Sequence, residues 1–227
     1  MYFQFGSNYL MLMLAALVIG AAAQFFVNSA YRRWSQVPLA TGRTGAEVAR
    51  KMLDEAGLFD VQVRPVAGQL TDNYDPRSRV LNLSQGVYDG RSVAAAGIAS
   101  HEAGHAVQHA RAFAPAALRQ ALVPAANLGS QGAWILIMLW MFTRVAGLIT
   151  LGAALFGLAV LFQVVTLPVE FDASRRAMAS LKANLFLPHE QVVGARRVLT
   201  AAAMTYVAAT LVSVMYLLYF LGLGRRR

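Results

Sequence analysis

Four runs of apolar residues alternate with two polar segments along the chain. The runs cover residues 9–27, 120–143, 145–169 and 201–223. Each is long enough to cross a bilayer, which takes roughly 20 apolar residues. The second run is the weakest, because polar residues and Pro124 interrupt it. Only Arg144 separates it from the third run, so the pair predicts a tight helical hairpin, with a single kinked, half-inserted element as the alternative.

The first apolar run has the features of a retained membrane anchor. A signal peptide is the alternative, because Ala21-Ala22-Ala23 resembles a cleavage site. However, basic residues do not precede the run. They follow it as Arg32-Arg33, which is the reverse of the order in a signal peptide. This order favours an anchor helix with its N-terminus outside.

The polar segment 28–119 has the pattern of a small mixed domain. The sequence Thr44-Gly-Ala-Glu47 matches a capping box and predicts a helix over 46–56. Residues 61–66 alternate between apolar and polar, as a half-buried strand does. The stretch "LTDNYDPRSRVLNLS" predicts a hairpin around Asp75-Pro76-Arg77-Ser78. A further helix begins at Ser92, and the edge of the predicted sheet could receive an extended peptide as an added strand.

The composition indicates a membrane protein and argues against nucleic-acid binding. Hydrophobic residues make up 57% of the chain and charged residues 14%, whereas about 25% charged residues is usual in soluble domains. The net charge of +9 comes from Lys and Arg that flank the apolar runs, without the basic and aromatic motifs of nucleic-acid-binding proteins. We therefore expect a bilayer with anionic lipids as a partner.

The distribution of positive charge predicts the topology. With four crossings and an outside N-terminus, residues 28–119 and 170–200 fall on the same side. They carry 16 of the 20 Lys and Arg, so both are expected in the cytoplasm of a multi-pass inner (plasma) membrane protein. The triplet at residues 225–227 is the exception, because it falls on the other side unless the last helix does not fully cross.

The motif H-E-x-x-H in "GIASHEAGHAVQHA" predicts a metal site. On a helix, residues i and i+4 share a face, so His101 and His105 can hold one ion. Glu102 lies about 100° around the helix. It is placed to accept a proton from water while the metal polarises a scissile carbonyl. The alternative is a chance match in a packed helix. The chain has no cysteine, so His, Asp or Glu must complete the site.

The third metal ligand is open at this point. His109 lies about 12 Å along the helix axis from His101, which is too far for zinc bonds of about 2 Å. We therefore expect His109 to be a second-shell, substrate-side or solvated residue. Proteases with a nearby third histidine have Gly and His at the positions of Gln108 and Arg111. A downstream carboxylate on another helix is the usual alternative.

Few side chains on the same predicted side of the membrane can serve as this ligand. Glu170 and Asp172 follow the third apolar run directly, and Pro168 would begin or kink the helix that presents them. His189 and Glu190 come later, where Glu190 fits an ordinary helix N-terminus.

The motifs together resemble those of the YugP-like bacterial membrane zinc metallopeptidases. The likeness covers nearly the whole chain and is carried by the segments "TGAEVARKML", "LTDNYDPRSRVLNLSQGVY", "GRSVAAAGIASHEAGHAVQHA" and "TLPVEFDASRRA". The chain is more distantly similar to the HtpX heat-shock proteases and the CAAX prenyl endopeptidases, which are gluzincins.

The resemblance implies a metal site with one zinc ion, bound by His101, His105 and Glu170, and hydrolysis of peptide bonds. Glu170 matches the Glu of the gluzincin pattern E-x-x-A-D, whereas Ser174 stands in place of its Asp. Ser174 or Asp172 would have to fill that second-shell role. Further candidates for a second-shell or oxyanion-stabilising role are Tyr206, Arg175 and His109.

The predicted fold class is an α-helical integral membrane protein, with about four transmembrane helices and a small α+β zincin-like cytoplasmic catalytic domain. Its expected parts are an anchor helix (1–30), the zincin-like domain (31–119), a transmembrane hairpin (120–169), a cytoplasmic segment with the third ligand (170–200), and a last transmembrane helix with a basic tail (201–227).

The predicted function is a zinc-dependent endopeptidase that acts on membrane or misfolded proteins. The alternative is a membrane adaptor or scaffold that retains the zinc site without turnover. The intact Glu102 argues against it, because a purely structural metal needs no base. A four-span transporter has little support, since apart from Glu170 and Asp172 the spans lack charged residues that would mark a pathway.

Overall fold

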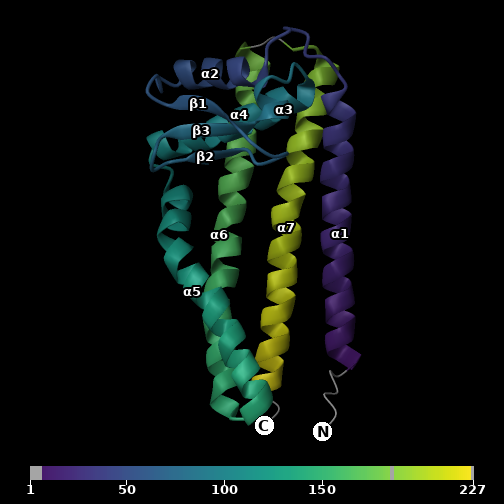
Figure 1. Cartoon of the computed structure of the whole chain (residues 1–227), viewed down its shortest axis with the longest axis vertical. Helices are drawn as coiled ribbons and strands as arrows, with labels where there is room; N and C mark the ends of the chain where they lie inside the picture. Colours follow the sequence, from purple (N-terminus) through teal and green to yellow (C-terminus); the bar gives the residue numbers. More distant parts are fainter. Residues whose placement is uncertain (1–6, 185–186, 226–227) are drawn as a thin grey trace. The chain divides into compact units, whose positions relative to one another are not determined.

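The computed structural model describes residues 7–184 and 187–225 and is mostly helical, with one small sheet (Figure 1). The helices are α1 (Ser7–Ser35), α2 (Gly45–Glu55), α3 (Gln85–Tyr88), α4 (Val93–Ala110), α5 (Ala114–Thr143), α6 (Ala146–Asn184) and α7 (His189–Arg225), and the strands are β1 (Gln62–Val66), β2 (Asn73–Asp75) and β3 (Val80–Ser84). The chain divides into two compact units. Unit 1 comprises Met1–Gln24, Leu118–Leu167 and Thr205–Arg227, and unit 2 comprises Phe25–Ala117 and Pro168–Met204.

The four expected long apolar helices are present. The segments long and apolar enough to cross a membrane are Asn8–Ser35, Ala114–Thr143, Gly147–Ala183 and His189–Gly224. All four extend past the apolar runs into the polar segments. The predicted hairpin is also present, because only Arg144 and Val145 separate α5 from α6, and Arg144 has a positive φ of 59°. Residues 1–6 of the predicted anchor and 226–227 of the predicted basic tail lie outside the described residues.

Unit 1 is held together by close helix packing. Its core contains Ile137, Trp140, Ile149, Ala153 and Phe220. A Cβ atom on Gly129 would lie 2.5 Å from the carbonyl oxygen of Leu155, so glycine is needed where α5 approaches α6. Many large apolar side chains of this unit point outward, as expected of a surface that lipid covers; they include Met11, Leu14, Leu128, Phe142 and Leu218.

The local elements predicted for unit 2 are confirmed. Thr44 caps α2, with its hydroxyl accepting from the Glu47 amide while the Glu47 carboxylate accepts from the Thr44 amide. The expected hairpin pairs β2 with β3, with Tyr74 opposite Leu81. Its turn is held by Asp75, which accepts hydrogen bonds from the Arg77 amide and the Ser78 hydroxyl.

The sheet has an order that the sequence pattern did not predict. Strand β1 pairs in parallel with β3, so the order is β1-β3-β2 and β3 is central. The central position explains the apolar composition of β3, in which Val80, Leu81 and Leu83 are buried. Strand β2 is an edge strand. The short helix α3 between β3 and α4 was also not predicted.

Helix α4 lies at the centre of unit 2, which explains its many small residues. Its N-cap is Ser92, as predicted, with the hydroxyl accepting from the Ala95 amide. One side packs into the core formed with α2 and the sheet. The other sides meet α6 and α7, since an added Cβ on Gly97 would lie 3.7 Å from Ala195 and one on Gly104 would lie 2.8 Å from the carbonyl oxygen of Ala173.

Of the two roles expected for Pro168, the structure excludes the start of a new helix. Pro168 lies inside α6, which continues to Asn184. Glu170, Asp172 and Ser174 therefore belong to the same helix as the third apolar run. Glu190 lies in the first turn of α7, as predicted.

Candidate metal centre

The two histidines of the motif face each other on α4. The ring centroids of His101 and His105 are 4.8 Å apart and nearly perpendicular. One potential ligand atom from each of His101, Glu102 and His105 lies within 4.8 Å of the other two, so this group could hold a metal ion. The i, i+4 spacing on a helix produces this convergence, as predicted.

Helix α6 brings Glu170 to the same point. Its Oε2 atom lies 3.2 Å from Nε2 of His101 and 3.6 Å from Nε2 of His105. The Glu170 side chain is only 2% exposed. In a tetrahedral zinc site with bonds of about 2.0–2.2 Å, neighbouring ligand atoms are about 3.3–3.5 Å apart. Both distances to the Glu170 oxygen are therefore close to the spacing of neighbouring ligands of one zinc ion.

The second ring nitrogen of His101 is held by Ser174. The Ser174 hydroxyl lies 3.1 Å from Nδ1 of His101. Such a contact fixes the orientation of a ligating imidazole. Of the two residues considered for this role, the structure has Ser174 at His101, while Asp172 acts elsewhere in the site.

The second ring nitrogen of His105 is held by Gln108, a residue that sequence reasoning did not assign to the site. Oε1 of Gln108 lies 3.0 Å from Nδ1 of His105. Nε2 of Gln108 donates to Asp172 at 2.9 Å and to the Val169 carbonyl at 2.7 Å. Asp172 is in turn paired with Arg176 at 2.6 Å and with Arg175.

These contacts select one tautomer of His105. Both N–H groups of the Gln108 amide donate to oxygens of Asp172 and Val169, which fixes the amide with Oε1 toward His105, and an amide oxygen only accepts. The neutral His105 ring must then carry its proton on Nδ1, which leaves the lone pair of Nε2 for a metal ion. The reversed amide would place its oxygen against two other oxygens, so this orientation is the stable one.

Charges around the site shift two pKa values. Burial disfavours a proton on His105, but hydrogen bonding to Glu170 and the nearby negative charges outweigh it and raise the pKa of His105 above 6.5. A proton and a metal ion therefore compete for this ring. Burial also raises the pKa of Asp72, despite hydrogen bonds from Ser84, and the charge of Glu102 adds to the increase. Asp72 is thus a second carboxyl group close to Glu102.

The other residues predicted for the site are His109, Arg175 and Tyr206, and each has a different position in the structure. His109 is exposed, and its Nδ1 lies 3.1 Å from the Tyr74 hydroxyl on β2. The guanidinium group of Arg175 pairs with Asp172. Tyr206 lies on α7 in unit 1, whereas the other residues belong to unit 2.

Gly104 explains how α4 and α6 approach each other closely beside the motif. An added Cβ would lie 2.8 Å from the carbonyl oxygen of Ala173, closer than real Cβ contacts. Ala173 lies between Asp172 and Ser174, so the close approach occurs next to the residues of α6 that contact the site. Within H-E-A-G-H, the glycine is therefore a packing requirement.

Comparison with known proteins identifies the family. Residues 9–225 match a family model described as "Putative neutral zinc metallopeptidase". The chain belongs to this neutral zinc metallopeptidase family. The resemblance to the YugP-like group is thereby confirmed, and the family name implies zinc as the metal.

One curated relative supports this assignment over most of the chain. The "Putative membrane protease YugP" of Bacillus subtilis (strain 168) is 47% identical over 212 residues, which is 93% of this chain and 94% of the relative. No solved structure matches the chain. The family match and the four long apolar helices agree with a metallopeptidase that resides in a membrane.

Proposed function

We propose that the protein is a zinc-dependent membrane endopeptidase that hydrolyses peptide bonds of membrane or misfolded proteins. The observation that carries the proposal is the convergence of Nε2 of His101, Nε2 of His105 and Oε2 of Glu170, with separations of 3.2 and 3.6 Å to the glutamate oxygen. These atoms would hold one zinc ion per chain and leave a fourth position open, as in catalytic zinc sites.

The residues around the ion suit hydrolysis. Zinc, when bound, supplies Lewis acidity that polarises a carbonyl and makes water easier to deprotonate. Glu102 follows His101 on α4 and would accept the proton of the attacking water. It would then donate that proton to the leaving amine. Ser174 and Gln108 contact Nδ1 of the two imidazole rings, which would leave both Nε2 atoms available to bind the ion.

The open edge of β2 supports binding of an extended peptide. Its partner on one side is β3, and as an edge strand it offers its other side for backbone hydrogen bonds. Tyr74 of β2 contacts His109 of α4, so this strand lies next to the helix that bears the motif. Tyr206, Arg175 and His109 remain the candidates for stabilising the oxyanion.

The charge distribution supports a site that faces the cytoplasm. Both segments that supply ligands belong to the polar parts of the chain, which carry most of its Lys and Arg. We therefore assign unit 2 to a zincin-like cytoplasmic domain of an inner (plasma) membrane protein.

The test compares Glu102→Gln with Glu190→Gln, which removes an equivalent charge from the first turn of α7. We expect Glu102→Gln to bind zinc like the unmodified protein but to cleave a fluorescently labelled unfolded protein at least about 100-fold more slowly. Glu190→Gln should retain both properties. Full activity of Glu102→Gln would exclude this mechanism. Stoichiometric zinc without cleavage in the unmodified protein would favour the adaptor or scaffold.

A further inference from the structure

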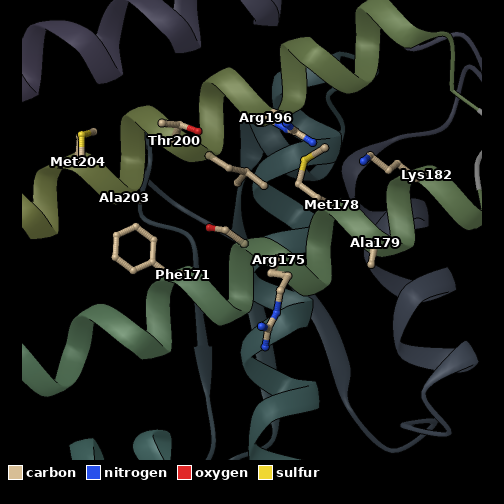
Figure 2. A pocket seen from close by; sticks show the side chains of 11 residues that line it. Phe171, Arg175, Met178, Ala179, Lys182, Arg196, Thr200, Ala203 and Met204 are labelled. Atoms are coloured by element: carbon tan, nitrogen blue, oxygen red, sulfur yellow. The ribbon is translucent and has the colours of Figure 1, made fainter.

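A groove of about 520 Å³ lies on unit 2 between the polar end of α6 and the first part of α7 (Figure 2). Its volume is within the range of about 300–1,000 Å³ that is usual for small-molecule sites. Most of its lining is apolar, with Phe171 and Met178 from α6 and Leu199 and Met204 from α7. The groove is therefore able to take up a hydrocarbon chain.

The charged side chains that line the groove are all basic. They are Arg175, Lys182 and Arg196, and no Asp or Glu lines it. Arg175 is paired with Asp172. For Lys182 and Arg196, no ion pair is present among the described residues. Two cations without counter-ions beside an apolar surface match the chemistry of an anionic amphiphile.

A second hollow on unit 2 shows that basic side chains without an ion pair are not a general feature of hollows on this unit. It is lined by α2 and neighbouring residues, where the basic side chains of Arg50 and Lys51 are paired with Asp54 and Glu55. Its charges are of both signs and largely compensate each other. Positive charge without compensation thus distinguishes the groove between α6 and α7.

The sequence around the groove connects it with the membrane. The apolar run 145–169 ends directly before Phe171, and Met204 lies within the apolar run 201–223. Lys182 and Arg196 lie farther from these runs along the same two helices. The groove thus changes from apolar to basic with distance from the apolar runs, as the surface of a bilayer changes from acyl chain to headgroup.

We propose that this groove binds an anionic phospholipid, with the phosphate near Lys182 and Arg196 and an acyl chain along Phe171 and Met204. The Thr200 hydroxyl lines the same wall and can donate to a phosphate oxygen. The site is independent of peptide hydrolysis and does not require zinc. Ser174, which holds His101, also lines the groove, so a bound lipid would lie beside the candidate metal centre.

The test measures lipid binding to the full chain in phosphatidylcholine nanodiscs that contain a minority of phosphatidylglycerol. Native mass spectrometry of the released protein would give the bound lipid. Arg196→Gln is compared with Arg197→Gln, because both substitutions remove one positive charge from adjacent exposed positions of α7 and only Arg196 lines the groove.

We expect Arg196→Gln to weaken phosphatidylglycerol binding about fivefold, and the double variant with Lys182→Gln about 30-fold, from the usual contribution of one basic residue near an anionic surface. Arg197→Gln should change binding less than about twofold by the same reasoning, because its side chain does not line the site. Phosphatidylcholine should not replace phosphatidylglycerol.

Three results would overturn the proposal. Equal weakening by Arg196→Gln and Arg197→Gln would mean that only the overall charge matters. Displacement of the lipid by inorganic phosphate alone would assign the cations to a free anion. Unchanged lipid binding in the double variant, with a raised KM for peptide cleavage, would assign the groove to the substrate.

Discussion

Substitution of Gln108 by Met should weaken zinc binding without abolishing the fold. Methionine has a similar length but cannot accept the proton on Nδ1 of His105 at 3.0 Å, nor donate to Asp172 and the Val169 carbonyl. Loss of a second-shell partner typically weakens metal binding about 10- to 100-fold. The stability cost should be about 1 kcal/mol, at the lower end for a lost buried hydrogen bond, because Asp172 keeps both arginines.

The assay is competition for zinc between the purified full chain and a chromophoric chelator, combined with thermal unfolding in detergent. Gln191→Met is the matched control, because the Gln191 amide likewise accepts through its oxygen and donates to a backbone carbonyl. It accepts from the Ala40 amide and donates to the Pro38 carbonyl, both at 3.0 Å. It should lose less stability than Gln108→Met, because its hydrogen bonds are exposed, and it should keep its zinc affinity. Wild-type zinc affinity in Gln108→Met would refute the tautomer argument, as would equal weakening in both variants.

Three further predictions follow from packing, ligand geometry and charge. Gly104→Ala should lower the stability of the fold by about 1–3 kcal/mol through the clash between α4 and α6, and it should weaken zinc binding. Gly157→Ala is the control, because the space around its added Cβ is open, and it should change neither property. Equal effects of the two substitutions would contradict the packing argument. His109→Ala should retain the zinc content of the unmodified protein in metal analysis, and loss of the zinc would make His109 a ligand. The hydrogen bond from the Ser78 hydroxyl, and to a smaller extent the one from the Arg77 amide, lowers the pKa of Asp75 below 3.8. The ionised Asp75 carboxylate therefore stabilises the fold above pH 3.8, and this contribution is lost as the pH falls through the pKa of the folded state. Asp75→Asn should therefore unfold at a lower temperature than the unmodified protein at neutral pH but not in strong acid, and an equal difference at both would contradict this assignment.

The features predicted from sequence are those encoded within a few neighbouring residues. The capping box joins Thr44 to Glu47, and the turn at Asp75 is closed by its next neighbours. The motif on α4 is equally local, because a helix brings residues four apart to one face. Such elements depend little on the rest of the chain, so their sequence signals are sufficient.

The features that were missed depend on contacts between distant residues. The parallel pairing of β1 with β3 has no local signal, since β1 lacks the continuous apolar run that is typical of parallel strands. Gln108 was considered only as the residue at a position where another class of protease has glycine. Its spacing of three from His105 was a usable signal, but its partner Asp172 is 64 positions away.

Pro168 shows why a strong local signal can mislead. A proline removes one helical hydrogen bond and usually marks a helix boundary. In α6 the helix continues through it, and the adjacent Val169 and Glu170 are buried, with 1% and 2% of their surface exposed. Tertiary packing of the residues that follow the proline therefore outweighs its local preference for ending a helix.

The ligand set can be measured by crystallography of the full chain loaded with zinc, with diffraction recorded on both sides of the zinc absorption edge. We expect one anomalous peak per chain, about 2.0–2.2 Å from Nε2 of His101, Nε2 of His105 and a carboxylate oxygen of Glu170. Glu102 should approach the open position without occupying a ligand position. A peak bound by His101, His105 and Glu102, with Glu170 turned away, would contradict the assignment of ligand and base.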